Sequence, residues 1–381
     1  MMATWALIIC ALGSCTIHLF FVWRMRRIIA SRQQSTSDTI NQELSNDPHA
    51  GVSVIVCAKN EALRLDTLIP KILEQNYQNF ELIIVDDHST DQTQLILDQW
   101  STKDPRVKGV TPNIIKARQH GKKAALTYGI AKASNNLLLM TDADCVPSSV
   151  DWIDLMTAPL RAGKSVALGY GGYNQTSGFL NALIRYETTL TGGLYLGQAL
   201  AGHPYMGVGR NLAYQKEFFV SSGGFDSHEH IPSGDDDLLI NHRANSTNTG
   251  VVIDPNAFTW SEPKTTWMSL LRQKRRHQTT ANLYRMASKI TLSLYSGSIL
   301  LFYISVLLLF FNALSNPNIY WILLGLLTLR SAYLIGFMGP IFSRLKSPDL
   351  RPWTPLLEPV LIYMQLVIFV WNSVSKPNHW N

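Results

Sequence analysis

Four long apolar segments constrain the fold of this chain most, because each has roughly the 20 residues that a helix needs to cross a bilayer. One segment covers residues 3–23, and the other three lie near residues 292–314, 319–338 and 356–371. They gather at the two ends of a chain of 381 residues, and the first contains no Asp, Glu, Lys or Arg. The sequence therefore predicts four membrane-spanning helices around one middle domain.

The charges beside these segments favour a membrane anchor over a cleaved signal peptide, because no charge precedes the first segment while several cations follow it. The flanking cations are Arg24, Arg26, Arg27 and Arg32 after the first segment, and Arg344, Lys346 and Arg351 between the third and the fourth. Cationic flanks remain on the cytoplasmic side. We therefore expect an integral protein of a bacterial inner (plasma) membrane, with the middle domain in the cytoplasm and both termini outside.

The net charge of +6 favours an anionic membrane surface as a partner over nucleic acid. Much of this charge comes from the flanks of the apolar segments and from residues 274–276, and the sequence carries no nucleic-acid-binding motif. Of the four cysteines, two lie in the first apolar segment, and Cys57 and Cys145 lie in the middle domain. Because the cytoplasm keeps thiols reduced, we expect neither a disulfide nor a zinc site.

Apolar runs alternate with helical patterns in the middle domain. The runs at residues 52–57, 82–85 and 137–140 end in polar residues, which is typical of buried parallel strands. Helical patterns lie between these runs. This alternation predicts a doubly wound α/β sheet.

The composition along the chain predicts the boundaries of its parts. They are a membrane anchor at residues 1–24, a polar tether at 25–50, the cytoplasmic α/β domain at 51–262, a basic amphipathic helix in the membrane interface at 263–290, and a C-terminal membrane region at 291–381. The alternative for the basic segment is a solvated helix end whose charges only fix the topology.

A polar cluster follows each predicted strand, at residues 59–61, 86–88 and 142–144. Ligands of doubly wound sheets bind at the carboxyl ends of the strands, so these clusters should converge. Alternate residues of an extended segment project the same way, and Asp142 and Asp144 could therefore reach one metal ion. An isolated pair of this kind is more often a turn cap, and the position after a buried strand favours the metal site.

Two charged groups lie at predicted helix starts. Lys122 and Lys123 precede a helical pattern, where exposed backbone amides favour a diphosphate. Asp235, Asp236 and Asp237 precede another, and crowding of like charges can raise one pKa towards that of a general base. Solvated charge and helix capping are the structural alternatives.

Five motifs occur in the order seen in family 2 glycosyltransferases of GT-A fold. They lie at residues 54–61, 85–91, 121–126, 141–144 and 234–236, and the resemblance covers about residues 50–285. The chain is similar to membrane-bound members, distantly including enzymes of the cellulose synthase, hyaluronan synthase and ceramide glucosyltransferase type. The resemblance implies a GT-A domain that uses a nucleotide-diphosphate sugar and a divalent cation, Mg²⁺ or Mn²⁺.

The resemblance implies donor-binding roles for the first three motifs. Asp86 or Asp87 resembles the acid that binds the nucleotide, and Glu61 belongs to the motif after the first strand. Lys122 resembles the residue beside the diphosphate.

The last two motifs imply the chemistry. Asp142 and Asp144 resemble the sugar and metal motif, with Asp144 the favoured metal ligand. Asp236 resembles the catalytic base, and Asp235 is the alternative. A base-activated hydroxyl that displaces the nucleoside diphosphate in one step would invert the anomeric centre.

The acceptor side rests on two further resemblances. Asn211 lies in a segment similar to the one that faces the acceptor in membrane-bound members. Gln273, Arg276 and His277 resemble a Gln-x-x-Arg-Trp motif in which histidine replaces the tryptophan that contributes to the acceptor site of polymer synthases. Four spans are also few for a polysaccharide channel. We therefore expect non-processive transfer to a lipid, lipid-linked or envelope-glycan acceptor, with a processive polysaccharide synthase as the alternative.

Other hypotheses compete with this function. A haloacid-dehalogenase-like phosphatase also uses an Asp-x-Asp loop, but normally after its first core strand, and a catalytically inactive membrane scaffold could keep the fold. Arg330 lies in the middle of the third apolar segment, where an ionised side chain is costly, so it should face the helix bundle or a lipid phosphate. Pairing with Glu358 is disfavoured, because Glu358 lies nearer the cytoplasmic end of its segment.

Overall fold

The computed structural model describes residues 2–31, 49–112, 121–231 and 233–375. Within these residues, four helices are long and apolar enough to cross a membrane. They are α1 (Met2–Ser31), α11 (Met286–Ala313), α12 (Ile319–Arg344) and α13 (Thr354–Val374). Most of the predicted tether lies outside the described residues.

The middle of the chain folds around a seven-stranded sheet in the order β3-β2-β1-β4-β8-β6-β9. The strands are β1 (Val52–Ala58), β2 (Phe80–Asp86), β3 (Val107–Val110), β4 (Leu137–Asp142), β6 (Val166–Leu168), β8 (Leu212–Gln215) and β9 (Thr249–Val251). The first four are parallel, whereas β8 is antiparallel to both β4 and β6. The predicted α/β fold is confirmed, and the three predicted strands are neighbours at its centre.

The two faces of the sheet are covered by different helices, because alternate residues of each strand point to opposite sides. Val54 and Val56 of β1 belong to one apolar core, and Ile55 belongs to the other. The first core includes apolar residues of α3 (Ala62–Leu73), α4 (Thr93–Lys103) and α6 (Trp152–Arg161). The second includes those of α5 (Lys122–Lys132). Strands buried on both sides explain the continuous apolar runs of the sequence.

Short elements complete the α/β domain. A second sheet has the order β5-β10-β7, with β5 (Cys145–Pro147), β7 (Gly171–Tyr173) and β10 (Thr259–Ser261). The short helices are α8 (Lys216–Ser221), α9 (Asp237–Arg243), η1 (Asp226–His228), η2 (Pro255–Ala257), η3 (Ala281–Leu283) and η4 (Pro348–Trp353). The predicted basic helix is shorter than expected, because α10 covers only Trp267–His277 and α11 already begins at Met286.

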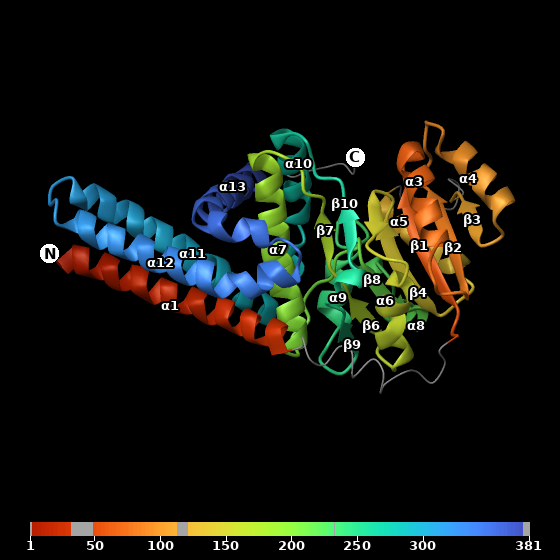
Figure 1. Cartoon of the computed structure of the whole chain (residues 1–381), viewed down its shortest axis with the longest axis horizontal. Coiled ribbons are helices and arrows are strands. Elements are labelled where there is room, and N and C mark those ends of the chain that lie inside the picture. Colours follow the sequence, from red (N-terminus) through yellow and green to blue (C-terminus); the bar gives the residue numbers. More distant parts are fainter. Residues whose placement is uncertain (1, 32–48, 113–120, 232, 376–381) are drawn as a thin grey trace.

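The helix α7 (Phe179–Leu200) joins the α/β domain to the membrane helices. Figure 1 shows it between the sheet and the ends of the apolar helices, and it contacts α1, α12 and α13. Glycines permit this close approach. A Cβ atom at Gly193 would lie 2.9 Å from Ile341 Cγ2 of α12, and one at Gly197 would lie 3.4 Å from Met25 Cγ of α1.

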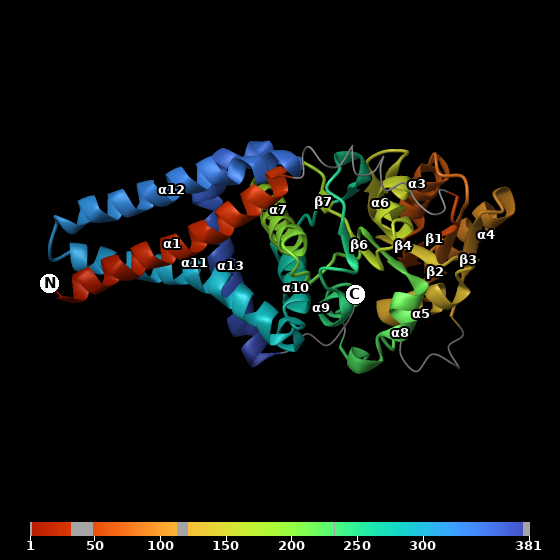
Figure 2. The ribbon, with the colours of Figure 1, turned by 90° about the horizontal axis from the view of Figure 1, so that it is seen from below.

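The helix α13 takes a different path from the other three apolar helices. α1, α11 and α12 extend side by side away from the α/β domain, whereas α13 crosses their base beside α7 and α10 (Figure 1, Figure 2). In its last turn, Asn372 Oδ1 accepts a hydrogen bond from Arg275 Nε of α10 at 2.9 Å. The C-terminal end of α13 therefore lies at the end of the helix bundle that faces the α/β domain. The sequence predicted a fourth crossing, which would have placed this end of α13 at the opposite end of the bundle. Length and hydropathy alone do not set the direction of a helix.

A buried polar network ties α13 to the bundle. Arg330 Nε lies 2.6 Å from Glu358 Oε2, and both side chains are almost completely buried. Glu358 also accepts a hydrogen bond from Tyr303, and Arg330 donates one to Tyr333. Pairing of Arg330 with Glu358 was therefore wrongly disfavoured. After α12 the chain folds back along that helix, and Arg351 Nε donates a hydrogen bond to Ile335 O at 2.6 Å. This return brings Glu358 to the same level along α12 as Arg330.

Replacing Glu358 by glutamine should destabilise the membrane module by about 3–5 kcal/mol, because the buried Arg330 guanidinium would lose its counter-charge. Denaturant unfolding of the purified protein in detergent would measure this loss. The double variant Arg330→Met/Glu358→Leu removes both charges and should recover most of the stability. Glu217→Gln, at an exposed site on α8, is the matched control. Equal losses in the single and the double variant would contradict this account.

Candidate active site

The loops after β1 and β2 form one preorganised corner of the site. Asn60 and His88 both adopt a left-handed backbone conformation with φ of 57°. Asn60 N donates to Ser89 Oγ at 2.8 Å, and Thr90 N donates to Asn60 Oδ1 at 2.7 Å. The sequence of the two loops thus provides the polar groups that bind them to each other.

The two acids after β2 have different surroundings, although both are buried. Asp86 Oδ1 accepts hydrogen bonds from Ser89 N and Ser89 Oγ, so it stabilises its own turn. Asp87 Oδ2 accepts no hydrogen bond from the described residues and lies 3.8 Å from Lys59 Nζ. A buried carboxylate oxygen without a hydrogen-bond donor suits an incoming ribose or base, which favours Asp87 over Asp86 as the nucleotide-binding acid.

Glu61 lies beside these loops at the N-terminus of α3 and is half-buried. Desolvation raises its pKa, although Arg64 Nη1, 2.5 Å from Glu61 Oε2, opposes this shift. The charge of Asp144 also contributes to the pKa of Glu61. Glu61 therefore belongs to the same rim as the acids after β4.

The residues after β4 fit a divalent cation. Ligand atoms of Asp142, Asp144 and Cys145 lie within 4.8 Å of one another. Burial raises the pKa of the Cys145 thiol well above its usual range, and its sulfur lies 2.8 Å from Ser261 Oγ. A protonated thiol is a poor ligand for a hard cation, so the two carboxylates would hold Mg²⁺ or Mn²⁺. Asp142 is already paired with a lysine, which leaves Asp144 the freer ligand.

Lys122 joins the two acidic clusters of the chain. Its ammonium lies 2.7 Å from Asp142 Oδ1 and 3.1 Å from Asp235 Oδ2. Burial would lower the pKa of Lys122, but these carboxylates outweigh it and hold the pKa well above its usual range. Burial would likewise raise the pKa of Asp235, but Lys122 outweighs it and lowers that pKa. The sequence pointed to a diphosphate site and gave no sign of this bridge.

Asp236 is the acid whose environment best fits a general base. Its Oδ2 accepts a hydrogen bond from Gly209 N at 2.7 Å, and its Oδ1 accepts one from Asp237 N at 2.9 Å. Desolvation, then the charges of Asp235 and Asp237, raise the pKa of Asp236 to about 7, against the lowering effect of Lys122. A base with a pKa near 7 is both ionised and basic enough to accept a proton at physiological pH.

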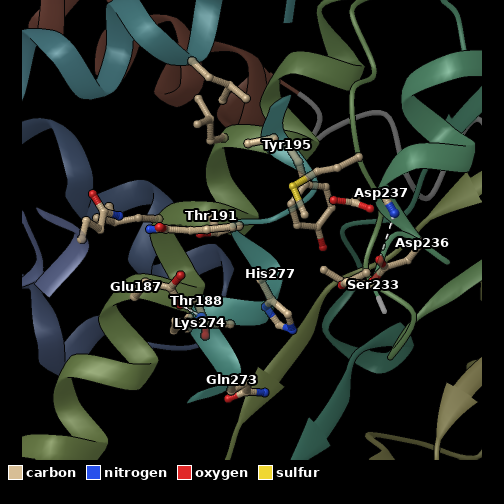
Figure 3. A pocket seen from close by; sticks show the side chains of 18 of the residues that line it. Glu187, Thr188, Thr191, Tyr195, Ser233, Asp236, Asp237, Gln273, Lys274 and His277 are labelled. Carbon is tan, nitrogen blue, oxygen red and sulfur yellow. Dashed lines mark hydrogen bonds and ion pairs between the residues drawn. The ribbon is translucent and has the colours of Figure 1, made fainter. Parts of the chain in front are cut away.

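A cavity of about 400 Å³ connects these acids with the membrane helices. Asp142, Asp235 and Asp236 line one end, and residues of α11 and α13, including Glu358, line the other. Residues of α7 and α10 form the walls between them. In the view of Figure 3, His277 of α10 lies between Glu187 of α7 and Asp236. The acids at the rim of the sheet thus open towards the apolar part of the molecule.

Three of the four predicted acceptor residues line this cavity, namely Gln273, Arg276 and His277. The His277 side chain is exposed to the cavity, and desolvation there, then the charges of Lys274 and Arg276, place the pKa of His277 well below its usual range. The prediction that Asn211 faces the acceptor is wrong, because its amide is buried. Asn211 accepts a hydrogen bond from Trp152 and donates two to backbone carbonyls.

Several cavity residues had no signal in the sequence. Glu187 and Lys274 form an ion pair of 2.5 Å between α7 and α10, and Thr188 and Thr191 of α7 line the same wall. Only the packing of α7 against the acids reveals these groups, because the sequence of α7 matches no motif. A search for polar residues on one face of an otherwise apolar helix could have identified them.

Two family models match this chain. The model of "Glycosyl transferase family 2" matches residues 53–220, and that of "Glycosyl transferase family group 2" matches residues 142–338. The chain is 26% identical over 234 residues to the probable glycosyltransferase YdaM of Bacillus subtilis, covering 59% of this chain and 54% of that protein. It is 26% identical over 159 residues to the beta-monoglucosyldiacylglycerol synthase of Synechocystis sp., covering 38% of this chain and 32% of that protein.

The chain thus spans about half, or less, of the length of these curated relatives. Among solved structures, the fold is similar to that of the mannosyltransferase PcManGT from Pyrobaculum calidifontis, with a TM-score of 0.57 and 17% identity. That similarity covers 94% of this chain and 97% of the other, and therefore includes the apolar helices as well as the α/β domain.

Replacing Lys122 by methionine should destabilise the α/β domain by about 3–5 kcal/mol at pH 8, because Asp142 and Asp235 would lose their shared cation. The loss should be smaller at pH 5. Without Lys122 the pKa of Asp235 rises, because the cation that lowers it is lost, and an acid whose pKa is raised in the folded state costs stability only above that pKa. Thermal unfolding at the two pH values would measure the difference. The control is Lys132→Met at the exposed end of α5, and an equal loss at both pH values would contradict the bridging role.

Proposed function

Because the chain belongs to the family 2 glycosyltransferases, we propose that it is a membrane-bound enzyme that transfers one sugar from a nucleotide-diphosphate sugar to a lipid or lipid-linked acceptor. The cavity between Asp236 and the helices α11 and α13 is the observation that carries this proposal. It offers one route by which a membrane-embedded molecule can present a hydroxyl to the acids. An envelope glycan at the membrane surface is the broader alternative for the acceptor.

The donor would bind at the carboxyl ends of β1, β2 and β4. Asp87 would accept hydrogen bonds from the nucleoside, with Asp86 holding its own turn and the Glu61 backbone amide bound to Thr93 Oγ1 of α4. Lys122 would exchange part of its interaction with Asp142 for the diphosphate. A divalent cation held by Asp144 and Asp142 would neutralise charge that develops on the leaving nucleoside diphosphate. The mannosyltransferase of similar fold was solved with GDP-Man and Mn²⁺, which supports a donor and a cation of these classes.

Asp236 would act as the base on the acceptor side. Its carboxylate takes the proton from the acceptor hydroxyl while that oxygen attacks the anomeric carbon, and the nucleoside diphosphate leaves from the opposite face. One displacement of this kind inverts the anomeric configuration. Asp235 is the weaker alternative, because the ion pair with Lys122 lowers its pKa and therefore its basicity.

The acceptor would lie with its polar end between α7 and α10 and its apolar part against α11 and α13. Leu292, Ile299, Leu361 and Ile368 give this end of the cavity an apolar wall. The name of the Synechocystis relative, a glucosyldiacylglycerol synthase, supports a lipid acceptor. His277 offers a smaller and more polar surface than tryptophan, which supports single transfer over processive synthesis.

We further propose the inner (plasma) membrane of a bacterium as the location, with the α/β domain in the cytoplasm and the N-terminus outside. The arginines at the end of α1 and those after α12 lie at the end of the bundle nearest the domain. Nucleotide sugars are cytoplasmic metabolites, so this orientation also exposes the donor site to its substrate.

Purified protein in lipid nanodiscs, given labelled nucleotide sugars and a divalent ion, should transfer a single sugar into the lipid-extractable fraction. Asp236→Asn should lower the transfer rate about 10²- to 10⁴-fold, the usual effect of losing a general base. Chelation of the divalent ion should also abolish transfer. Asp66→Asn, at an exposed site on α3, is the matched control and should leave the rate unchanged.

The other outcomes of this experiment identify the competing functions. A ladder of products would establish a processive polysaccharide synthase. Phosphate release from a phosphomonoester without a sugar acceptor would indicate a phosphatase. A protein that binds no nucleotide sugar, and whose Asp236→Asn variant leaves cells unchanged, would be a scaffold.

The acidic limb of the profile of kcat/KM against pH should have an apparent pKa near 7, because only ionised Asp236 can accept the proton and its pKa is raised to about 7. Transfer should therefore be nearly lost at pH 5 and maximal above pH 8. Initial rates in buffers of constant ionic strength would give the profile. A limb below about pH 4, where an unshifted or lowered aspartate titrates, would assign the base to Asp235 instead.

A further inference from the structure

The third acid of the second cluster, Asp237, has no part in the chemistry proposed above, yet it is buried and fully hydrogen-bonded. Its Oδ2 accepts hydrogen bonds from Tyr284 Oη at 2.7 Å and from Thr280 Oγ1 at 2.5 Å. Its Oδ1 accepts one from Leu238 N at 2.7 Å. The two hydroxyls come from residues 280–285, the segment that joins α10 to the membrane helix α11, which we call the α10–α11 connection.

Other residues of α9 bind the same connection. Asn241 lies one helical turn after Asp237 and thus on the same face of α9. Its Oδ1 accepts a hydrogen bond from Arg285 N at 2.7 Å, and its Nδ2 donates to Tyr205 O at 2.8 Å. His242 Nε2 lies 3.1 Å from Leu283 O. One face of α9 is therefore bound along its length to the start of the membrane module.

The position of Asp236 follows from this attachment. Asp236 is the N-cap of α9, and its Oδ1 is held by the backbone amide of Asp237. Any rotation or shift of the first turn of α9 would move that amide, and with it the carboxylate. A distance error of about 1 Å between reacting groups can cost 10²-fold in rate.

We propose that Asp237, Thr280 and Tyr284 are positioning residues, which hold the base Asp236 in register with the acceptor cavity by binding α9 to the α10–α11 connection. The inference rests on the proposed function. It gives the α10–α11 connection a second task besides leading into the membrane helix, because Tyr284 of this connection lines the acceptor cavity and also holds the helix that carries the base.

A helix-stabilising role does not account for these contacts. An acid in the first turn of a helix interacts favourably with the exposed backbone amides and needs no further partner. The capping function is already supplied by Asp236. Asp237 instead accepts hydrogen bonds from two hydroxyls that lie 43 and 47 positions further along the chain. Such charge-assisted hydrogen bonds are among the stronger hydrogen bonds in proteins.

The test compares four variants of the full chain in nanodiscs: Tyr284→Phe, Thr280→Val, the double variant and Asp237→Asn. The double variant should lower kcat about 10- to 100-fold, while KM for the nucleotide sugar changes less than about 2-fold, because the donor corner lies on β1, β2 and β4. Tyr363→Phe, an exposed tyrosine of α13, is the matched control and should retain the wild-type kcat. An unchanged donor KM also shows that a variant has kept its fold.

The pH profile distinguishes positioning from general stability. Several titratable side chains interact electrostatically with Asp236, so that one charge shifts the pKa of the other. They include Asp235, Asp237, Lys122, Lys123, Tyr195 and Tyr284. Asp237→Asn removes one negative charge from this group, so the acidic limb of kcat/KM should move to lower pH. Tyr284→Phe keeps the charge of Asp237. Its kcat should therefore fall, whereas the acidic limb of its pH profile should not move to lower pH.

The inference is overturned if the double variant and Asp237→Asn both keep the wild-type kcat and the wild-type acidic limb. This conclusion holds whether or not these variants yield less folded protein. In that case the wild type and Tyr363→Phe remain active, and the proposed function stands. If the wild type itself transfers no sugar from any donor, the proposed function fails and the positioning role fails with it.

Discussion

The ion bridge made by Lys122 is the interaction on which the rest of the site depends. It places one ammonium between Asp142 at the end of β4 and Asp235 before α9, 2.7 Å and 3.1 Å away. Without a shared cation, two acidic clusters could not approach each other in a partly buried site, because each charge would raise the pKa of the next. The bridge holds the two acidic clusters beside one cavity, and Lys122 itself is placed by its position at the start of α5.

The second constraint is the close packing of α7 against both halves of the molecule. Glycines allow α1 and α12 to approach one side of this helix, while its polar residues face the cavity on another. The same helix therefore closes the apolar bundle and provides polar groups near the acids. Its ion pair with α10, between Glu187 and Lys274, links the wall of the cavity to the segment that leads into α11.

The sequence predicted the parts of the structure that depend on local pattern. The strands β1, β2 and β4 are apolar runs, and their polar ends meet because parallel strands share one edge. The path of α13, the Arg330–Glu358 pair and the burial of Asn211 could not be predicted, since each depends on how distant elements pack. Asn211 shows the limit clearly: its motif was visible, but only the structure shows that Trp152 and two carbonyls already use its amide.

The three consecutive acids at residues 235–237 show how tertiary contacts divide one sequence motif into separate roles. Asp235 faces Lys122, and its pKa is lowered, so it serves as a fixed negative charge. Asp236 accepts hydrogen bonds from two backbone amides, and desolvation, then the charges of Asp235 and Asp237, raise its pKa to about 7, so it is the acid of the three best suited to accept a proton at neutral pH. Asp237 also lines the cavity, and it accepts hydrogen bonds from two hydroxyls of the α10–α11 connection. The start of α9 falls within this motif, because Asp237 is the first residue of the helix, Asp236 is its N-cap and Asp235 precedes it, and each acid therefore meets a different neighbour.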